Sequence, residues 1–292
     1  MLKFYQADVF AGQPFGGNPV AVFPDAQGLT DFQLQQIARE MNLSETVFVL
    51  PPTDQAAVVR LRIFTPTQEI PFAGHPVLGT FYVLAQLGLI AITDGVTRLM
   101  QECNIGLFPV ELHAREGRVT HVVMTQPKPL FLGSVDEPED LFDISKALGL
   151  SIHQIVDTKK PVMVVSTGLP VVIVPDAAAI VEVCERVGTN GIMVFTTMTV
   201  EDHSTVHTRM FAPAIGILED PATGSASGAM GAYLVHNGLV EVGPTTEVIV
   251  EQGYEIGRPA RILVQIESDD DAIQEVKVGG QCVMVVKGTL TF

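Results

Sequence analysis

The chain has 292 residues, enough for one large domain or two of ordinary size, and its 47% hydrophobic content is typical of a globular protein. Seventeen Lys and Arg against 33 Asp and Glu give a formal net charge of -16. This charge repels phosphate backbones and anionic lipid surfaces, so we expect neither nucleic acid nor a membrane as partner. A small carboxylate held by local backbone N–H groups is compatible with it.

The chain begins without the basic leader and long apolar stretch of a signal peptide. Its most apolar run, residues 76–92, contains glycines and is too short to cross a membrane. We therefore expect a cytoplasmic protein. Cys103, Cys184 and Cys282 are odd in number and widely separated, which predicts ordinary thiols and no metal site.

The first half of the chain is predicted to alternate strands and helices. Residues 17–23 follow a turn and have the pattern of a buried strand. Thr30 and Gln33 predict a capping box at the start of a helix, and a second, buried helix is expected to end near Gly88. Further strands are predicted at residues 46–50, 97–101, 108–113 and 119–125.

The second half repeats this order. The phrase Arg62-Ile-Phe-Thr-Pro66 recurs as Arg209-Met-Phe-Ala-Pro213, and each copy leads into a loop containing glycine. Residues 168–174 likewise repeat the turn and strand of residues 17–23. The other elements predicted here are a helix over 176–184 and strands at 192–196, 247–252, 260–266 and 274–278. The chain is therefore interpreted as an internal duplication.

Each half is expected to bury one face of a mostly antiparallel sheet against a central helix, which gives an α+β fold of two pseudo-symmetric domains. Gln126-Pro127-Lys128-Pro129 breaks regular structure and predicts domains over residues 1–127 and 128–282. A short helix is predicted over residues 139–148. The last strand, residues 283–292, has no clear counterpart in the first half, and it pairs either within the second domain or back with the first.

The two glycine loops are candidate anion-binding sites. Gly74-His75-Pro76 and Gly224-Ser225 both precede predicted helices, whose free N–H groups and positive dipole ends favour a carboxylate or phosphate. The alternative is that the glycines only permit tight turns and close helix packing. Neither loop contains a nucleotide-binding motif.

Two acids distinguish the halves. Glu45 stands where a helix meets an apolar strand, and aligning Phe48 with Phe195 places Ile192 at the equivalent position. Burial there would raise the pKa of Glu45, as suits a general base near neutral pH, whereas the alternative is a solvated acid at a strand edge. Asp220 precedes the second glycine loop and has no acidic equivalent beside the first. It is either a turn residue or a ligand for a polar group of the substrate.

His75 stands between Gly74 and Pro76 at the start of a predicted helix. The helix dipole opposes a second positive charge at this end, so we expect a less basic imidazole than usual. His75 is a candidate proton donor or anion contact, with a purely structural role as the alternative.

Five segments carry a resemblance to a known family. They are FGGNPVAVF at 15–23, MNLSETVF at 41–48, RIFTP at 62–66, PFAGHPVLGT at 71–80 and EDPATGSA at 219–226. Together they resemble the PhzF-like phenazine-biosynthesis isomerases over nearly the whole chain. The resemblance implies the diaminopimelate-epimerase-like fold, an active site in the cleft between two domains, and a homodimer.

The resemblance also implies roles for individual residues. Glu45 matches the glutamate that shuttles the proton. The residues at positions that bind or polarise the substrate are Asn18, Ser44, Gly74, His75, Asp220, Gly224 and Ser225. The family's enzyme moves a proton between carbons of a cyclic dihydro-hydroxyanthranilate-type acid without a cofactor. We therefore expect a cofactor-independent isomerase of a small cyclic amino or hydroxy carboxylic acid, with Glu45 as its acid and base.

Two other functions stay open. One is a two-base amino-acid epimerase with Glu45 and Asp220 on opposite faces of the substrate, and the other is a non-catalytic protein that binds small carboxylates. Epimerases of the implied fold use two facing cysteines at the glycine loops. Because these loops contain no cysteine here, a thiol-based racemase is disfavoured.

Overall fold

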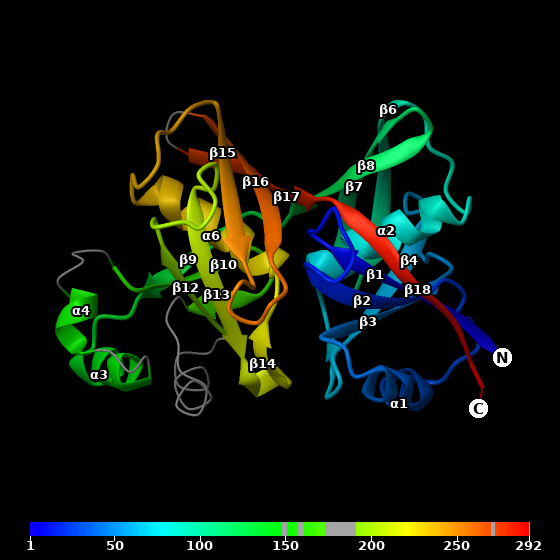
Figure 1. The fold of residues 1–292 in the computed structure, drawn as a ribbon, viewed down its shortest axis with the longest axis horizontal. Helices are drawn as coiled ribbons and strands as arrows, with labels where there is room; N and C mark the ends of the chain where they lie inside the picture. The colour runs from blue at the N-terminus through cyan, green and yellow to red at the C-terminus, as the bar shows by residue number, and fades with distance from the viewer. Residues whose placement is uncertain (148–150, 157–160, 173–190, 270–271, 292) are drawn as a thin grey trace.

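The computed structural model describes residues 1–147, 151–156, 161–172, 191–269 and 272–291. Figure 1 shows two lobes joined at a narrow centre, with both chain ends on the outer side of one lobe. The predicted helix over residues 176–184, with Cys184, lies outside the described residues. Each strand predicted within them is present.

The first lobe holds the first half of the chain and the last strand. Its elements are β1 (Leu2–Val9), β2 (Asn18–Phe23), α1 (Asp31–Met41), β3 (Glu45–Leu50), β4 (Val59–Phe64), β5 (Glu69–Ile70), α2 (His75–Gln86), β6 (Gly95–Cys103), β7 (Gly106–Arg115), β8 (Arg118–Gln126) and β18 (Cys282–Leu290). The predicted capping box of Thr30 and Gln33 is formed at the start of α1. Both predicted helices of this half are therefore confirmed.

The second lobe holds the rest of the chain. Its elements are β9 (Leu130–Ser134), α3 (Pro138–Ala147), α4 (Ile152–Val156), β10 (Met163–Ser166), β11 (Pro170–Val172), β12 (Gly191–Thr196), β13 (Val206–Ala212), η1 (Pro213–Ile215), β14 (Ile217–Asp220), α6 (Gly224–His236), β15 (Thr245–Gln252), β16 (Ala260–Asp269) and β17 (Ala272–Gly280). The short helix predicted over residues 139–148 corresponds to α3.

Helices α2 and α6 are the centres of the two lobes. The sheet contacts α2 through β1, β2, β3, β7, β8 and β18, and α6 through β10, β15, β16 and β17. A helix surrounded by strands in this way needs apolar or small side chains on almost every face. Helix α6 has them, among others Ala226, Ala229, Gly231 and Ala232. None of the helices in the described ranges is long and apolar enough to cross a bilayer. The expected α+β architecture is confirmed.

The lobes exchange one strand each. At the centre β8 pairs antiparallel with β17, and the chain then continues into β9, which pairs with β10 in the second lobe. In the same way β17 continues into β18, which pairs with β1 in the first lobe, with Leu290 opposite Leu2. The last strand thus crosses back to the first lobe, and β9 takes the corresponding place in the second lobe. Leu130 and Leu132 of β9 are exposed, which hides this strand from a search for buried apolar runs. The boundary between 127 and 128 stays a prediction.

The repeated phrase builds the same local structure in both lobes. The guanidinium group of Arg62 forms a two-bond ion pair with Glu69 and lies over the ring of the phenylalanine two residues later. Arg209 does the same with Glu219 and with its own following phenylalanine. The two arginines are therefore equivalent positions of the duplication.

The strand register corrects the alignment of the halves. Phe48 lies opposite Arg62, and Val194 lies opposite Arg209. Phe48 is therefore equivalent to Val194 and not to Phe195. Two runs of apolar residues match almost equally well in either register, whereas the hydrogen-bonded pairing allows only one.

The same register makes Gly191, and not the predicted Ile192, the equivalent of Glu45. No side chain fits at Gly191, since a Cβ there would lie 2.6 Å from Cε of Met210 and 2.7 Å from the carbonyl oxygen of Phe211. The buried acid of the first lobe thus has no chemical counterpart in the second.

Candidate active site

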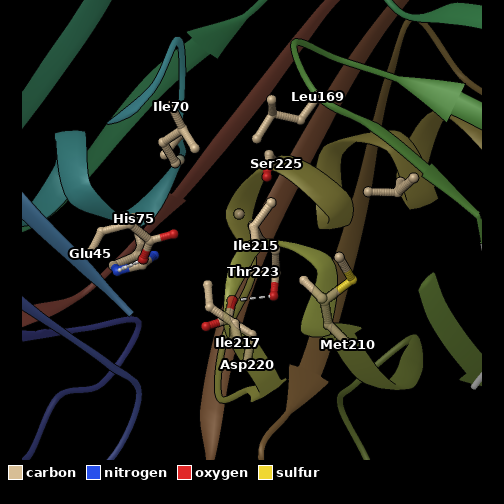
Figure 2. Close-up of a pocket in the computed structure, with 15 residues that line it drawn as sticks. Glu45, Ile70, His75, Leu169, Met210, Ile215, Ile217, Asp220, Thr223 and Ser225 are labelled. Atoms are coloured by element: carbon tan, nitrogen blue, oxygen red, sulfur yellow. Dashed lines mark hydrogen bonds and ion pairs between the residues drawn. The ribbon is translucent and has the colours of Figure 1, made fainter. Parts of the chain in front are cut away.

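A pocket lies where the lobes meet, at the first turns of α2 and α6 (Figure 2). It collects residues from both predicted glycine loops and from the strands beside them. The predicted site residues that line it are Glu45, Gly74, His75, Asp220, Gly224 and Ser225. Asn18 and Ser44 complete the predicted set by contacting Asp220.

The two central helices meet start to start at Gly74 and Gly224. A Cβ on Gly74 would lie 2.9 Å from the backbone N of Ser225, and one on Gly224 would lie 3.3 Å from Cα of Gly74. Any side chain at either position would push the helices apart. Close packing thus requires these glycines, and it also brings the free N–H groups and positive dipole ends of both helices to one pocket.

Glu45 is the first residue of β3, and its side chain lines the pocket. It is 6% exposed, which excludes the solvated strand-edge alternative. Burial raises the pKa of Glu45 well above its ordinary value, and the negative charge of Asp220 raises it further. A carboxyl group of this kind exchanges protons more readily near neutral pH than an exposed one.

His75 opens α2 beside Glu45. Its Nε2 atom lies 3.2 Å from Oε2 of Glu45, without the geometry of a hydrogen bond. Burial lowers the pKa of His75 to about 3, outweighing the opposite effect of a hydrogen bond with the backbone of Pro19. The imidazole is therefore neutral at physiological pH, as expected, although burial and not the helix dipole is the main cause.

Asp220 ends β14 and is 5% exposed. Its Oδ1 accepts a hydrogen bond of 2.8 Å from Nδ2 of Asn18, and its Oδ2 accepts one from the hydroxyl of Thr223. Burial raises the pKa of Asp220 to about 6, although hydrogen bonds from Thr223, Asn18 and Ser44 act in the opposite direction. This carboxyl group changes charge close to neutral pH.

One support of Asp220, Gln252, is not predicted from the sequence, and the predicted Asn18 makes a second contact beside it. Gln252, fully buried at the end of β15, donates from Nε2 to the carbonyl oxygen of Asp220 at 2.6 Å and accepts from the N–H of Thr223 at 3.2 Å. Asn18 also donates to the carbonyl oxygen of Ala222 at 2.8 Å. A buried amide at the end of an apolar strand is the signal that points to Gln252.

An apolar wall faces the polar groups and is also missed by the sequence reasoning. Its larger side chains are Ile70, Leu169, Met210, Ile215 and Ile217. Figure 2 places Glu45 and His75 on one side of the pocket, with Leu169 and Met210 on the other. A bound molecule would therefore meet Glu45 and His75 on one side and mainly hydrocarbon on the other, with Asp220 beside Ile217.

Two residues of the wall are the apolar counterparts of polar residues of the site. Ile70 lies opposite Ile63 in the first lobe as Asp220 lies opposite Met210 in the second, so Ile70 is the equivalent of Asp220. Leu169 likewise occupies the position of Asn18 in the other half. At these two positions, therefore, only one copy of the duplication carries a polar side chain.

Neither of the described cysteines lines the pocket. Cys103 is buried in β6, and Cys282 is partly buried at the start of β18. Within the described ranges, no three His, Cys, Asp or Glu side chains are arranged to hold a metal ion. The titratable side chains that line the pocket are two carboxyl groups and one imidazole, those of Glu45, Asp220 and His75.

Comparison with known proteins gives concordant matches. The model of the family described as phenazine biosynthesis-like protein matches residues 7–288. A trans-2,3-dihydro-3-hydroxyanthranilate isomerase from Pseudomonas chlororaphis is 38% identical over 289 residues, covering 97% of this chain and 97% of its own.

Solved structures match over the whole chain as well. A phenazine biosynthesis protein of the PhzF family from Bacillus anthracis has a TM-score of 0.86 and 28% identity, covering 100% of this chain and 99% of its own. A probable proline racemase from Agrobacterium radiobacter has a TM-score of 0.71 over 100% and 93% of the two chains, and its 14% identity makes this a likeness of fold alone. The expected diaminopimelate-epimerase-like fold is confirmed.

Proposed function

The chain belongs to the phenazine biosynthesis-like family of isomerases, and we propose that it moves a carbon-bound proton within a small cyclic amino or hydroxy carboxylic acid, without a cofactor. One observation carries the proposal. Two buried carboxyl groups, Glu45 and Asp220, share a pocket with the start of two helices. The substrate named for the Pseudomonas relative, an anthranilate derivative with carboxyl, amino and hydroxyl groups on one ring, belongs to the proposed class.

The geometry supports a defined orientation of such an acid. Its carboxylate would accept hydrogen bonds from the N–H groups at the starts of α2 and α6. Its amino or hydroxyl group would donate to Asp220, which Asn18 holds in place. The ring carbons would then lie against the apolar wall, where hydrocarbon is buried at low cost.

Glu45 would carry the proton. Its carboxylate removes a proton from one ring carbon, the electron pair of the broken C–H bond moves into the conjugated system, and Glu45 returns the proton to a second carbon on the same face. A substrate ammonium group beside Asp220 would offset the negative charge that raises the pKa of Glu45. While the proton is on Glu45, the neutral imidazole of His75 would accept a hydrogen bond from it.

A single base is favoured over two. Hydrogen bonds from Asn18 and Thr223 hold the carboxyl group of Asp220 in place. A fixed carboxyl group of this kind suits a substrate ligand better than an acid or base that exchanges protons. The position equivalent to Glu45 in the other lobe is Gly191, which provides no second base. Membership in a family of isomerases also disfavours the purely non-catalytic alternative.

The test is proton exchange in heavy water. We expect the enzyme to convert trans-2,3-dihydro-3-hydroxyanthranilate, or another cyclic amino acid of a tested series, to a positional isomer detectable by NMR and mass spectrometry. Glu45→Gln should lower the rate by roughly 10² to 10⁴-fold, while the exposed Glu247→Gln serves as the unaffected control. Deuterium uptake that survives Glu45→Gln would disprove the role of Glu45.

The same measurement separates the alternatives. A two-base epimerase would invert a stereocentre and put solvent deuterium into the product in every turnover. A binding protein would take up carboxylates in calorimetry without any exchange at carbon.

The homodimer implied by the resemblance is proposed as well, and light scattering should then give about twice the chain mass of 31.4 kDa.

A further inference from the structure

Arg258 joins the two lobes close to the pocket. It follows β15 in the second lobe and contacts three acceptors in the first. Its Nη2 donates to Oδ1 of Asp8 at 2.8 Å and to the carbonyl oxygen of Gly16 at 2.9 Å, while its Nε donates to the carbonyl oxygen of Gly17 at 2.8 Å. Asp8 is 1% exposed. Only the forked guanidinium group can hold a carboxylate and two carbonyl groups together.

The turn that Arg258 holds has little freedom. The N–H of Gly17 donates to the carbonyl oxygen of Pro259 at 3.0 Å, so the second lobe contacts this residue through both of its backbone polar groups. Gly17 has a φ of 59°, and a Cβ there would lie 2.0 Å from the carbonyl oxygen of Val9. The direction in which the chain enters Asn18 is therefore set from both lobes.

Asn18, the next residue along the chain, connects this turn to the site. Its Nδ2 lies 2.8 Å from Oδ1 of Asp220, across the junction of the lobes. Gly253, with a φ of 82°, packs against the carbonyl oxygens of Arg258 and Pro221, since a Cβ there would lie 2.4 Å and 2.5 Å from them. Arg258 and the residue that follows Asp220 thus pack against one glycine, and Asn18 connects the turn held by Arg258 to Asp220 itself.

We propose that Arg258 is a positioning residue of the reaction, which holds the turn of Gly16 and Gly17 so that Asn18 fixes the carboxyl group of Asp220. Arg258 does not line the pocket, so it acts through Asn18 and not on the substrate. The consequence for catalysis rests on the proposed function, because it assumes that Asp220 orients the substrate. The consequence for the contact between Asn18 and Asp220 does not.

The first test is kinetic. Arg258→Met should lower kcat roughly 10 to 100-fold, because displacement of an orienting group by about 1 Å has an effect of this size, while KM changes much less. Arg258→Lys should retain an intermediate kcat, since an ammonium group still pairs with Asp8 but lacks the fork. Arg98→Met is the matched control, because Arg98 pairs with Glu111 within one lobe, and its kcat should match the wild type. An unchanged kcat in Arg258→Met overturns the proposal.

The second test asks whether Arg258 acts through Asn18. Asn18→Leu introduces the residue found at the equivalent position of the other half, Leu169. The double variant Asn18→Leu with Arg258→Met should then be no slower than Asn18→Leu alone. If the two losses multiply, Arg258 stabilises the fold in some independent way and the proposal is wrong.

The third test needs no substrate and remains decisive if the proposed function fails. In protein labelled with ¹⁵N at asparagine, the side-chain amide of Asn18 is assigned by its loss in Asn18→Leu. Its exchange with solvent should be at least about tenfold faster in Arg258→Met and partly restored in Arg258→Lys, since the hydrogen bond to Asp220 opens more often. Unchanged exchange overturns the proposal. If Arg258→Met does not fold, Asp8→Asn replaces it in both measurements, because it removes the charge that pairs with Arg258 and keeps an oxygen that can accept the hydrogen bond from the N–H of Phe15.

Discussion

Nε2 of His75 and Oε2 of Glu45 lie 3.2 Å apart, buried together at the start of α2. The pKa of the acid is raised and that of the imidazole is lowered, so the uncharged forms of both are favoured. After a small rotation, a protonated Glu45 donates a hydrogen bond to the neutral imidazole nitrogen at this distance. An ionised Glu45 would instead place its oxygen against the lone pair of that nitrogen, with no hydrogen between them.

This contact predicts the effect of replacing the imidazole. His75→Leu removes the polar atom beside the proton carrier and should lower kcat roughly tenfold or more, equivalent to about 1.4 kcal/mol in the transition state. His75→Gln keeps a polar group and should lose less. Steady-state kinetics on both variants check this, and a wild-type kcat in His75→Leu would show that the contact has no part in the reaction.

Asp220 predicts the pH dependence of the reaction. Its pKa of about 6 means that it loses its charge as the pH falls through this value, and an ammonium group of the substrate would then lose its partner. We expect kcat/KM to decrease about tenfold per pH unit below pH 6. Asp220→Asn should be slower at pH 7, and its remaining acidic limb should belong to Glu45 and lie at lower pH, because the charge that helps to raise the pKa of Glu45 is gone. A limb that persists unchanged in Asp220→Asn must belong to another group.

The meeting of the helices at Gly74 predicts sensitivity to a single methyl group. A Cβ in Gly74→Ala would lie 2.9 Å from the backbone N of Ser225, which cannot move without its helix. We expect a loss of about 1–3 kcal/mol of stability, visible as a lower Tm, together with loss of activity. Gly243→Ala is the matched control, because its Cβ would meet only the carbonyl oxygen of Thr245 at 3.6 Å. Equal Tm values for the two variants would contradict this account.

Local signals were sufficient for much of the fold. The side chains of Thr30 and Gln33 cap α1 because both groups lie within one turn, and the repeated phrase around Arg62 and Arg209 reveals the duplication directly. The same repeat draws attention to Glu45, since an acid that interrupts an apolar strand in only one copy requires a reason.

Long-range pairing accounts for what the sequence did not reveal. The equivalence of Glu45 with Gly191 depends on hydrogen-bonded register, and apolar runs do not determine register to one residue. Arg258 contacts Gly17 from 241 positions away, and an arginine in an exposed turn carries no local sign of such a partner. Strand β9 was missed because its role is pairing and not burial.

His207 predicts a pH-dependent contribution to the stability of the second lobe. Its Nδ1 lies 2.8 Å from Glu251 and its Nε2 lies 2.9 Å from Glu255. Burial lowers the pKa of His207, but the hydrogen bonds and charges of Glu255 and Glu251 outweigh it, so the pKa is raised above 6.5. The stabilisation is therefore fully present below pH 6.5 and is lost as the pH rises through the raised pKa of the folded state.

The duplication supplies the control for this prediction. His207 lies opposite Glu251 as Arg60 lies opposite Glu102, so an arginine that does not titrate in this range takes the place of the imidazole in the first lobe. His207→Gln should lower Tm at pH 6 by roughly 2–4 °C per kcal/mol lost, and by less at pH 9. Arg60→Gln should change Tm equally at both pH values. If the two variants show the same pH dependence, the imidazole is not the titrating group, and the ion pairs of His207 add no pH-dependent stability.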